Sequence, residues 1–317
     1  MAAMMREMTS PKPPFESHVR FRAMNVAVHI VAVNASLYAL EAAQAEVHEC
    51  EARWSRFLAS SELSRINNRH TDQPIRLSAE TFELVAASVE AWRATDGRFD
   101  PTILPSLRAH GYDTTFAEIQ QRGDEVEPMW SPGCIAIELD PVTLEVTLPP
   151  GLQLDLSGIA KGHTADRVVG ALLATGATGA YANLGGDIRV AGQGPSSRGW
   201  IIGVDDPFDG ERTICTMAIV DGGIVTSTRL QRQWTRGGET QHHLIDPRTG
   251  APARSGVAAV TVLTATASTA EVLAKAVFVD GLDGGLELLA DHGVTGLLVD
   301  DEGRVHYGAG VEAFIIA

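Results

Sequence analysis

Residues 154–190 read LDLSGIAKGHTADRVVGALLATGATGAYANLGGDIRV, and they predict a strand, a turn, a helix and a second strand in that order. The first strand carries Asp155, and a Ser-Gly turn leads into a helix expected over residues 160–175. Gly176 is expected to end this helix, because glycine readily adopts the left-handed conformation found after helix ends. The second strand runs into a tight turn at residues 185–186, Gly-Gly.

Apolar residues outside this stretch also recur with helix and strand spacings. Spacings of 3 and 4 predict a long helix through Leu40, Ala43, Val47, Cys50, Trp54 and Phe57. Asn34 is its expected N-cap. Further elements are expected as a strand over 26–33, helices over 78–95, 268–279 and 284–292, a hairpin over 135–148, and turns at 222–223 and 246–247. This mixed order predicts an α+β fold built as one unit.

The composition limits the possible functions. The 317 residues include 40 acidic and 25 basic ones, which gives a formal net charge of −15. This balance argues against a nucleic-acid binder, because duplex affinity comes largely from phosphate neutralisation by Lys and Arg. A hydrophobic fraction of 44% supplies enough apolar material for a core, so disorder along the whole chain is excluded. Three dispersed cysteines fit neither a disulfide scaffold nor a zinc cluster.

The N-terminal segment predicts how the chain is organised. Residues 1–18 contain three prolines and little periodicity, so they are expected to be a disordered tail, with one domain over 19–317. No apolar stretch there is long enough for a signal peptide. No run approaches the ~20 apolar residues of a membrane span, so a cytoplasmic protein is expected.

Lys161 is a candidate ligand-binding residue. It is expected at the start of the 160–175 helix, where backbone N–H groups attract anions, and a lysine there would complete a phosphate cradle. The GxxxxGK[ST] spacing of a Walker A loop is absent. The alternative is an ordinary strand–turn–helix with an exposed lysine.

Residues 241–250, QHHLIDPRTG, place two histidines before a turn at Asp246-Pro247. In a concave site, His243 would act as a general base or acid near neutral pH. The alternative is a histidine of the core or surface without a chemical role. His242 should point the opposite way on a strand and is expected to face solvent.

Glu271 has two interpretations. Mg²⁺ prefers one or two carboxylates together with phosphate oxygens of a substrate, so Glu271 is a candidate metal ligand. Alternatively, Ser268-x-x-Glu271 before an apolar run is a capping box, in which the glutamate satisfies the helix start.

Seven short segments also occur in one characteristic order. They are FRAM (21–24), SRFLASSELSRIN (55–67), GRFDPT (97–102), DLSGIAKG (155–162), NLGGDI (183–188), VTSTR (225–229) and HHLIDPRTG (242–250). Together they resemble the ApbE family of flavin transferases, the FAD:protein FMN transferases. The resemblance runs from about Arg20 to the C-terminus.

The resemblance implies one large α+β, T-fold-related domain with mixed, mainly antiparallel sheets, flanking helices and FAD in a central cleft. It implies transfer of FMN from FAD to a Thr or Ser hydroxyl of an acceptor flavoprotein, with release of AMP. It also implies that His243 activates that hydroxyl. The positions that match FAD-site positions of the family are Met24, Phe57 (in place of the more usual Tyr), Arg98, Phe99, Asp100, Asp155 and Lys161.

The resemblance further implies one Mg²⁺ at the pyrophosphate, with Gly158, Glu271 and Lys275 at metal-ligand positions. Gly158 offers only a backbone carbonyl. The family usually places Asp and Thr four residues apart, whereas this chain has Glu271 and Lys275, which share a helix face. The Lys275 ammonium would substitute for part of the charge of the cation, repel the cation, or pair with Glu271.

Two other functions are compatible with these residues. One is a protein that binds FAD non-covalently and has lost transfer. The other is a FAD pyrophosphatase that releases FMN and AMP, with water as the acceptor. Metal dependence separates transfer and hydrolysis from simple binding, and an acceptor threonine separates transfer from hydrolysis.

Overall fold

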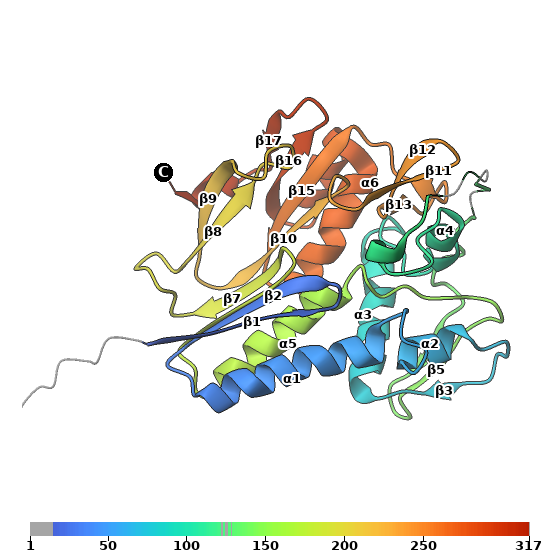
Figure 1. Cartoon of the computed structure of the whole chain (residues 1–317), viewed down its shortest axis with the longest axis horizontal. Coiled ribbons are helices and arrows are strands. Elements are labelled where there is room, and N and C mark those ends of the chain that lie inside the picture. Colours follow the sequence, from blue (N-terminus) through green and yellow to red (C-terminus); the bar gives the residue numbers. More distant parts are fainter. Residues whose placement is uncertain (1–14, 122, 124–125, 128, 317) are drawn as a thin grey trace, which may run out of the picture.

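The structure is a computed structural model, and it describes residues 15–121, 123, 126–127 and 129–316. Its largest sheet is antiparallel throughout (Figure 1). In spatial order its strands are β1 (Glu16–Ala23), β2 (Val26–Val33), β6 (Gly179–Leu184), β7 (Asp187–Gly192), β10 (Gly222–Thr228), β15 (Val257–Thr264), β16 (Thr295–Asp300) and β17 (Val305–Tyr307). Segments from both ends of the described chain thus share one sheet.

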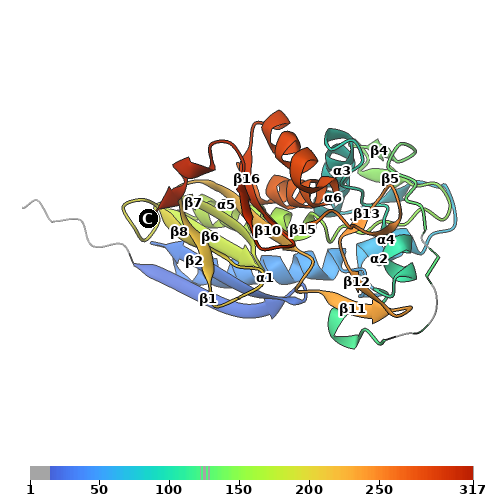
Figure 2. The ribbon, with the colours of Figure 1, turned by 90° about the horizontal axis from the view of Figure 1, so that it is seen from above.

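Three helices cover one face of this sheet: α1 (Leu37–Trp54), α5 (Ala160–Ala174) and α6 (Ala267–Asp291). Figures 1 and 2 show α1 and α5 lying side by side along the strands. The opposite face packs on a small sheet of β8 (Trp200–Asp205), β9 (Thr213–Ile219) and β18 (Ile315–Ile316). Alternate residues of β2 explain this arrangement, because Ile30 and Ala32 join the helix-side core while Val31 and Val33 join the other core.

A second core lies beyond the C-terminal end of α1. It is built by α2 (Glu62–Asn67), α3 (Ala79–Ala94) and a sheet of β3 (Ile75–Arg76), β5 (Glu145–Thr147) and β4 (Glu138–Asp140). The predicted hairpin over 135–148 is therefore confirmed. The remaining elements near the site are α4 (Leu104–Ala109), β11 (Gln233–Arg236), β12 (Glu239–His242), β13 (Ile245–Asp246) and β14 (Ala251–Pro252). The predicted α+β class is thus confirmed, with mainly antiparallel sheets and flanking helices.

Two predicted helix boundaries are wrong. Ser36, not Asn34, is the N-cap of α1, and its Oγ accepts from the Ala39 N–H at 3.2 Å. Asn34 has a positive φ of 58° and bridges the Phe15 N–H and the Thr178 hydroxyl instead. The helix ends at Trp54, so Phe57 lies outside it. The predicted helices over 268–279 and 284–292 are both present, joined in α6 at a kink at Gly281 (φ 79°).

Two further predictions need correction. Gly222 and Gly223 lie within β10 and do not form the predicted turn. A Cβ at Gly223 would lie 2.4 Å from the backbone nitrogen of Ala267, so this glycine permits the close approach of α6. β1 begins at Glu16, so the last three residues of the predicted tail belong to the sheet, while residues 1–14 lie outside the described residues. In the described chain, none of the helices has the length and apolar character needed to cross a membrane.

Gly162 sets the distance between α5 and α6. A Cβ at this position would lie 2.4 Å from the carbonyl oxygen of Ala267, so Gly162→Ala should lower the free energy of unfolding by about 1–3 kcal/mol. Gly170 is the matched control, because it is an exposed residue of the same helix where an added methyl group would meet no atom within 4 Å. Gly170→Ala should stabilise by about 0.5–1 kcal/mol. Urea denaturation of both variants checks this, and equal effects would contradict it.

Candidate active site

Two adjoining cavities lie where the sheet, the start of α5 and the second core meet. The first is lined by the predicted residues Arg98, Phe99, Asp100, Asp155, Gly158, Lys161, His243 and Lys275. The second is lined by Met24 and Phe57 and shares Asp155 and Lys161 with the first. Glu271 is fully buried directly behind them and contacts Lys161. The fold therefore brings together every residue predicted for catalysis, FAD binding or metal binding.

A cluster of four charged side chains forms the floor of the first cavity. The Lys161 ammonium contacts the carboxylates of Asp187, at the start of β7, and of Glu271 in α6, the latter at 2.7 Å. The Lys275 ammonium lies one helical turn from Glu271 and contacts the same Oε1 atom at 3.2 Å. The second oxygen of Glu271 accepts from the Gly162 N–H at 2.8 Å. Two positive and two negative side chains thus balance one another.

This geometry rules out the capping-box interpretation of Glu271. Thr266 is the N-cap of α6, and its hydroxyl accepts from the Thr269 N–H at 3.3 Å. The carboxylate of Asp166 in α5 accepts from the next two backbone N–H groups, those of Ala267 and Ser268. The helix start is therefore satisfied from another element, and Glu271 points to the lysines.

Burial and pairing set the protonation of this cluster. Burial alone would raise the pKa of Glu271, but the two lysines outweigh it and lower that pKa. Burial and the neighbouring Glu271 raise the pKa of Asp187 in spite of Lys161. The pKa of Lys161 is raised because its two carboxylate partners outweigh its burial. The pKa of Lys275 is lowered by burial and by Lys161.

The donor set at the metal positions does not fit Mg²⁺. Glu271 already accepts from two ammonium groups and a backbone amide, and Lys275 has no lone pair to offer while it is protonated. In the described ranges, no group of three or more His, Cys, Asp or Glu side chains is placed to hold a metal ion, so a Mg²⁺ here would depend on Glu271 and the substrate. A divalent cation at this place would also meet two positive side chains at close range.

His243 lies between β12 and β13 and faces the first cavity. Its Nδ1 atom is buried and has no hydrogen-bond partner among the described residues. Burial, followed by the nearby Arg232 and Lys275, holds the pKa of His243 well below 6.5. The imidazole is therefore neutral at pH 7 and has a free site for a proton.

The prediction that His242 faces solvent is wrong. Its side chain is 6% exposed, its Nε2 lies 3.1 Å from the Ala253 carbonyl, and its Nδ1 accepts from the Leu244 N–H. The ring of Phe278 in α6 packs against it edge-on, so this strand end is covered by the helix. Burial lowers the pKa of His242 to about 4. His242 is thus a structural residue that holds the segment leading to His243.

Arg56 is a residue of the site that the sequence analysis missed. Its guanidinium pairs with Asp155 at 3.2 Å, and both side chains are almost fully buried. It also lies over the rings of Phe57 and Tyr112, 4.2 and 4.5 Å from their centres. Arg56 stands inside the quoted segment 55–67, so its position in that motif was the available signal. Asp187 was missed in the same way inside the segment 183–188.

The loop around Pro101 is ordered by its own polar groups. The N–H and the hydroxyl of Thr102 both donate to Asp100 Oδ1 at 2.7 Å, and burial raises the pKa of Asp100. The Pro101 carbonyl accepts from the Asp155 N–H at 2.7 Å. This bond ties the loop to the segment that carries Asp155. That segment lies between β5 and α5 and forms no strand, so the strand predicted there is wrong.

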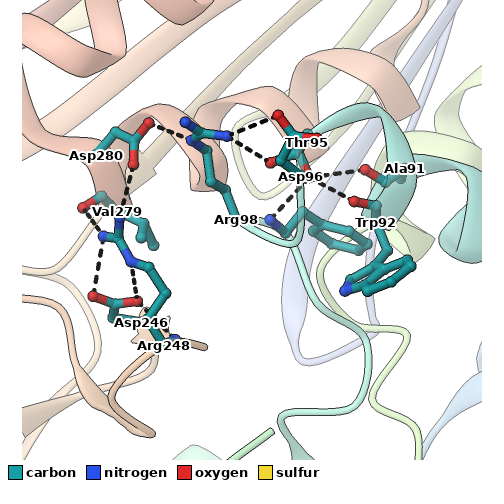
Figure 3. Close-up of polar contacts among 10 residues, drawn as sticks. Ala91, Trp92, Thr95, Asp96, Arg98, Asp246, Arg248, Val279 and Asp280 are labelled. Carbon is teal, nitrogen blue, oxygen red and sulfur yellow. Dashed lines mark hydrogen bonds and ion pairs between the residues drawn. The ribbon is translucent and has the colours of Figure 1, made fainter. Parts of the chain in front are cut away.

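Arg98 is held at the rim of the first cavity by a chain of ion pairs (Figure 3). Its Nε donates to Asp280, whose other oxygen accepts from Arg248 at 3.2 Å. Arg248 also pairs with Asp246 of β13 at 2.9 Å. Asp280 directly precedes the kink at Gly281, so the kink of α6 places the carboxylate that orients Arg98.

Loss of the Asp280 carboxylate should weaken ligand binding through Arg98. If Arg98 contacts FAD, Asp280→Ala should raise the dissociation constant for FAD by about three- to tenfold, because the guanidinium loses the closer and more buried of its two carboxylate partners, Asp280, and keeps only Asp96. Asp283→Ala, an exposed acidic residue of the same helix, should leave the constant unchanged. Flavin fluorescence titration measures both. An equal loss in the two variants would show a general charge effect.

Cationic groups, aromatic rings and a neutral histidine around one cavity define an enzyme site for a ligand with both a ring system and negative charge. The comparisons with known proteins agree with this class. The ApbE family model matches residues 24–298, and the chain therefore belongs to the ApbE family.

Individual relatives and a solved structure extend this result. The FAD:protein FMN transferase of Haemophilus influenzae is 30% identical over 256 residues, which cover 78% of this chain and 74% of that protein. The protein of the same name from Vibrio cholerae is 27% identical over 270 residues, covering 83% and 80%. The crystal structure of the ApbE protein of Thermotoga maritima has a TM-score of 0.86 at 27% identity and covers 96% of this chain and 100% of that chain.

Proposed function

We propose that this chain is a FAD:protein FMN transferase, which joins FMN from FAD to a threonine or serine hydroxyl of an acceptor flavoprotein and releases AMP. The observation that carries the proposal is that a neutral histidine and two ammonium groups line the same cavity in a chain of the ApbE family. The names of the relatives support the reaction.

In the proposed reaction, the acceptor oxygen forms a bond to the phosphorus next to riboflavin, and the pyrophosphate P–O bond to AMP breaks. His243 takes the proton of the hydroxyl, for which its neutral imidazole has a free site. Lys161 and Lys275 stabilise the charge that develops on the phosphate oxygens. The electron pair of the broken bond leaves on AMP.

The remaining predicted residues bind and orient FAD. Phe57 and Met24 offer an apolar wall to a ring in the second cavity. Arg98, Phe99 and Asp100 form one rim of the first cavity, and Asp155 stands between the two. FAD therefore lies across both cavities, with its pyrophosphate near Lys161.

The test is an intact mass spectrum of a threonine-containing acceptor fragment after incubation with this protein and FAD. A gain of one FMN on the fragment, with AMP in solution, is the expected result. Free FMN and AMP with an unmodified fragment would indicate the pyrophosphatase instead. Bound FAD without either product would indicate the non-covalent flavoprotein. A Thr or Ser attachment site on an acceptor flavoprotein and a cytoplasmic location stay predictions, whereas the predicted Mg²⁺ does not fit the donor set of this site.

A further inference from the structure

The lysines of this chain are concentrated at the site. Only three of its 25 basic residues are lysines, namely Lys12, Lys161 and Lys275. Two of these three line the first cavity. An ammonium is a compact point charge, whereas a guanidinium is a broad planar fork, so a lysine is the side chain closest in shape and charge density to a small cation.

The surroundings of Lys275 provide space for its side chain and keep it next to the ligand. The lysine stem packs against Gly158, since a Cβ there would lie at van der Waals distance from its Cδ and Cε atoms, 3.4 and 3.5 Å. The Nζ atom donates to Oε1 and to the backbone carbonyl of Glu271, both at 3.2 Å. The side chain is 20% exposed, which leaves the ammonium accessible from the cavity.

The charge balance of the floor also disfavours a metal ion. Asp187 and Glu271 are already matched by Lys161 and Lys275, and the cavity lining adds Arg232. An arriving divalent cation would have to displace ammonium groups from both carboxylates. An arriving pyrophosphate would instead find positive charge in place without displacing any of these groups.

We propose that the Lys275 ammonium takes the place of a divalent cation in this enzyme, so that FAD binding and FMN transfer proceed without a metal ion. The inference rests on the proposed function. The bonds formed and broken, and the proton acceptor His243, are those of the proposed transfer. The only difference is that the Lys275 ammonium, and not a divalent cation, neutralises the pyrophosphate oxygens.

The deciding experiment compares metal-stripped protein in EDTA with the same protein in Mg²⁺. FAD affinity is read by flavin fluorescence, and transfer by the mass of a threonine-containing fragment. We expect affinity and transfer rate to differ by less than about twofold between the two conditions. Transfer or binding that is lost in EDTA and restored by Mg²⁺ would overturn the proposal while leaving the proposed function intact. Absence of FAD binding in both conditions would overturn both. If FAD binds but no transfer occurs in either condition, the proposed function fails. The FAD affinities with EDTA and with Mg²⁺ then decide whether binding needs a metal ion.

Variants of Lys275 give a second, independent test. Lys275→Met removes the charge at similar volume and should weaken FAD binding in EDTA by about 10- to 100-fold. Lys275→Thr leaves the Glu271 carboxylate beside a hydroxyl, so it should lose affinity equally but regain it with Mg²⁺. Arg254→Met is the control, because it removes one charge from a side chain that is 81% exposed. Unchanged affinity in both Lys275 variants, with folding verified by circular dichroism, would contradict the proposal.

Discussion

Replacing His243 with alanine is expected to lower the rate of FMN transfer by about 10²- to 10⁴-fold, the usual contribution of a positioned general base. The affinity for FAD should change by less than about threefold, because the proposed role concerns the acceptor hydroxyl and not the flavin. The intact mass of the acceptor fragment over time measures the rate, and flavin fluorescence measures the affinity.

The pH profile gives this prediction a sharper form. The pKa of His243 lies well below 6.5 because the ring is buried beside Arg232 and Lys275. A lowered pKa keeps the base form present as the pH falls, so the rate should stay level through pH 6.5 and fall only well below it. A half-maximal rate near pH 6.5 would mean that the imidazole is solvated during the reaction.

A matched control separates the base from a general effect of histidine loss. His70 is exposed on the loop after α2, and His70→Ala should leave both rate and affinity unchanged. Transfer at the parent rate in His243→Ala would show that another group takes the proton. A parallel loss of FAD affinity would show that His243 holds the flavin and would contradict the assigned role.

Replacing Glu271 with alanine should lower the free energy of unfolding by about 3–5 kcal/mol, the usual cost of removing one partner of a buried ion pair. Glu271 is 0% exposed, and its loss leaves Lys161 and Lys275 without the carboxylate between them. It also leaves the Gly162 N–H without its acceptor. Urea denaturation at pH 7 measures the change.

Glu271 also predicts how the free energy of unfolding depends on pH in acid. Its pKa falls from the ordinary 4.5 to about 2 in the folded chain. A lowered folded-state pKa contributes stability that is present above pH 4.5 and is lost as the pH falls from there towards 2. The stability difference between the parent and Glu271→Ala should therefore shrink over this range.

An exposed ion pair serves as the control for this effect. Glu90 and Arg93 of α3 have side chains that are 70% and 54% exposed, and Glu90→Ala should cost about 0–1 kcal/mol. A cost for Glu271→Ala as small as that of the control would show that the cluster relaxes or admits water. The same result would weaken the view that Glu271 fixes the two lysines.

Local periodicity predicted most of the elements around the site. The helix over 78–95 and the helix that carries Lys161 form as expected, because their apolar stripes and end signals depend only on residues close together in the sequence. The prediction that Asn34 is the N-cap of α1 is wrong because distant partners engage its side chain. Its side chain is used by the Phe15 N–H and the Thr178 hydroxyl, the latter 144 residues away, and Ser36 is left to cap the helix.

Partners from distant elements explain the other differences. His242 is buried because the ring of Phe278 and the Ala253 carbonyl cover it. The predicted capping role of Glu271 is taken by Thr266 and by Asp166 of another helix. A spacing rule within one helix cannot show that a carboxylate 101 residues away fills the same role.

The sequence by itself determined the class of fold, the family and most of the residues that gather at the site, because these follow from periodicity and from motifs read along the chain; Arg56 and Asp187 were the exceptions. Tertiary structure alone decided which charges meet. Lys161 and Lys275 share one carboxylate only because Gly162 lets α5 approach the start of α6. The electrostatics of a buried site depend on distances of a few ångströms between distant segments, and only the packed helices set those distances.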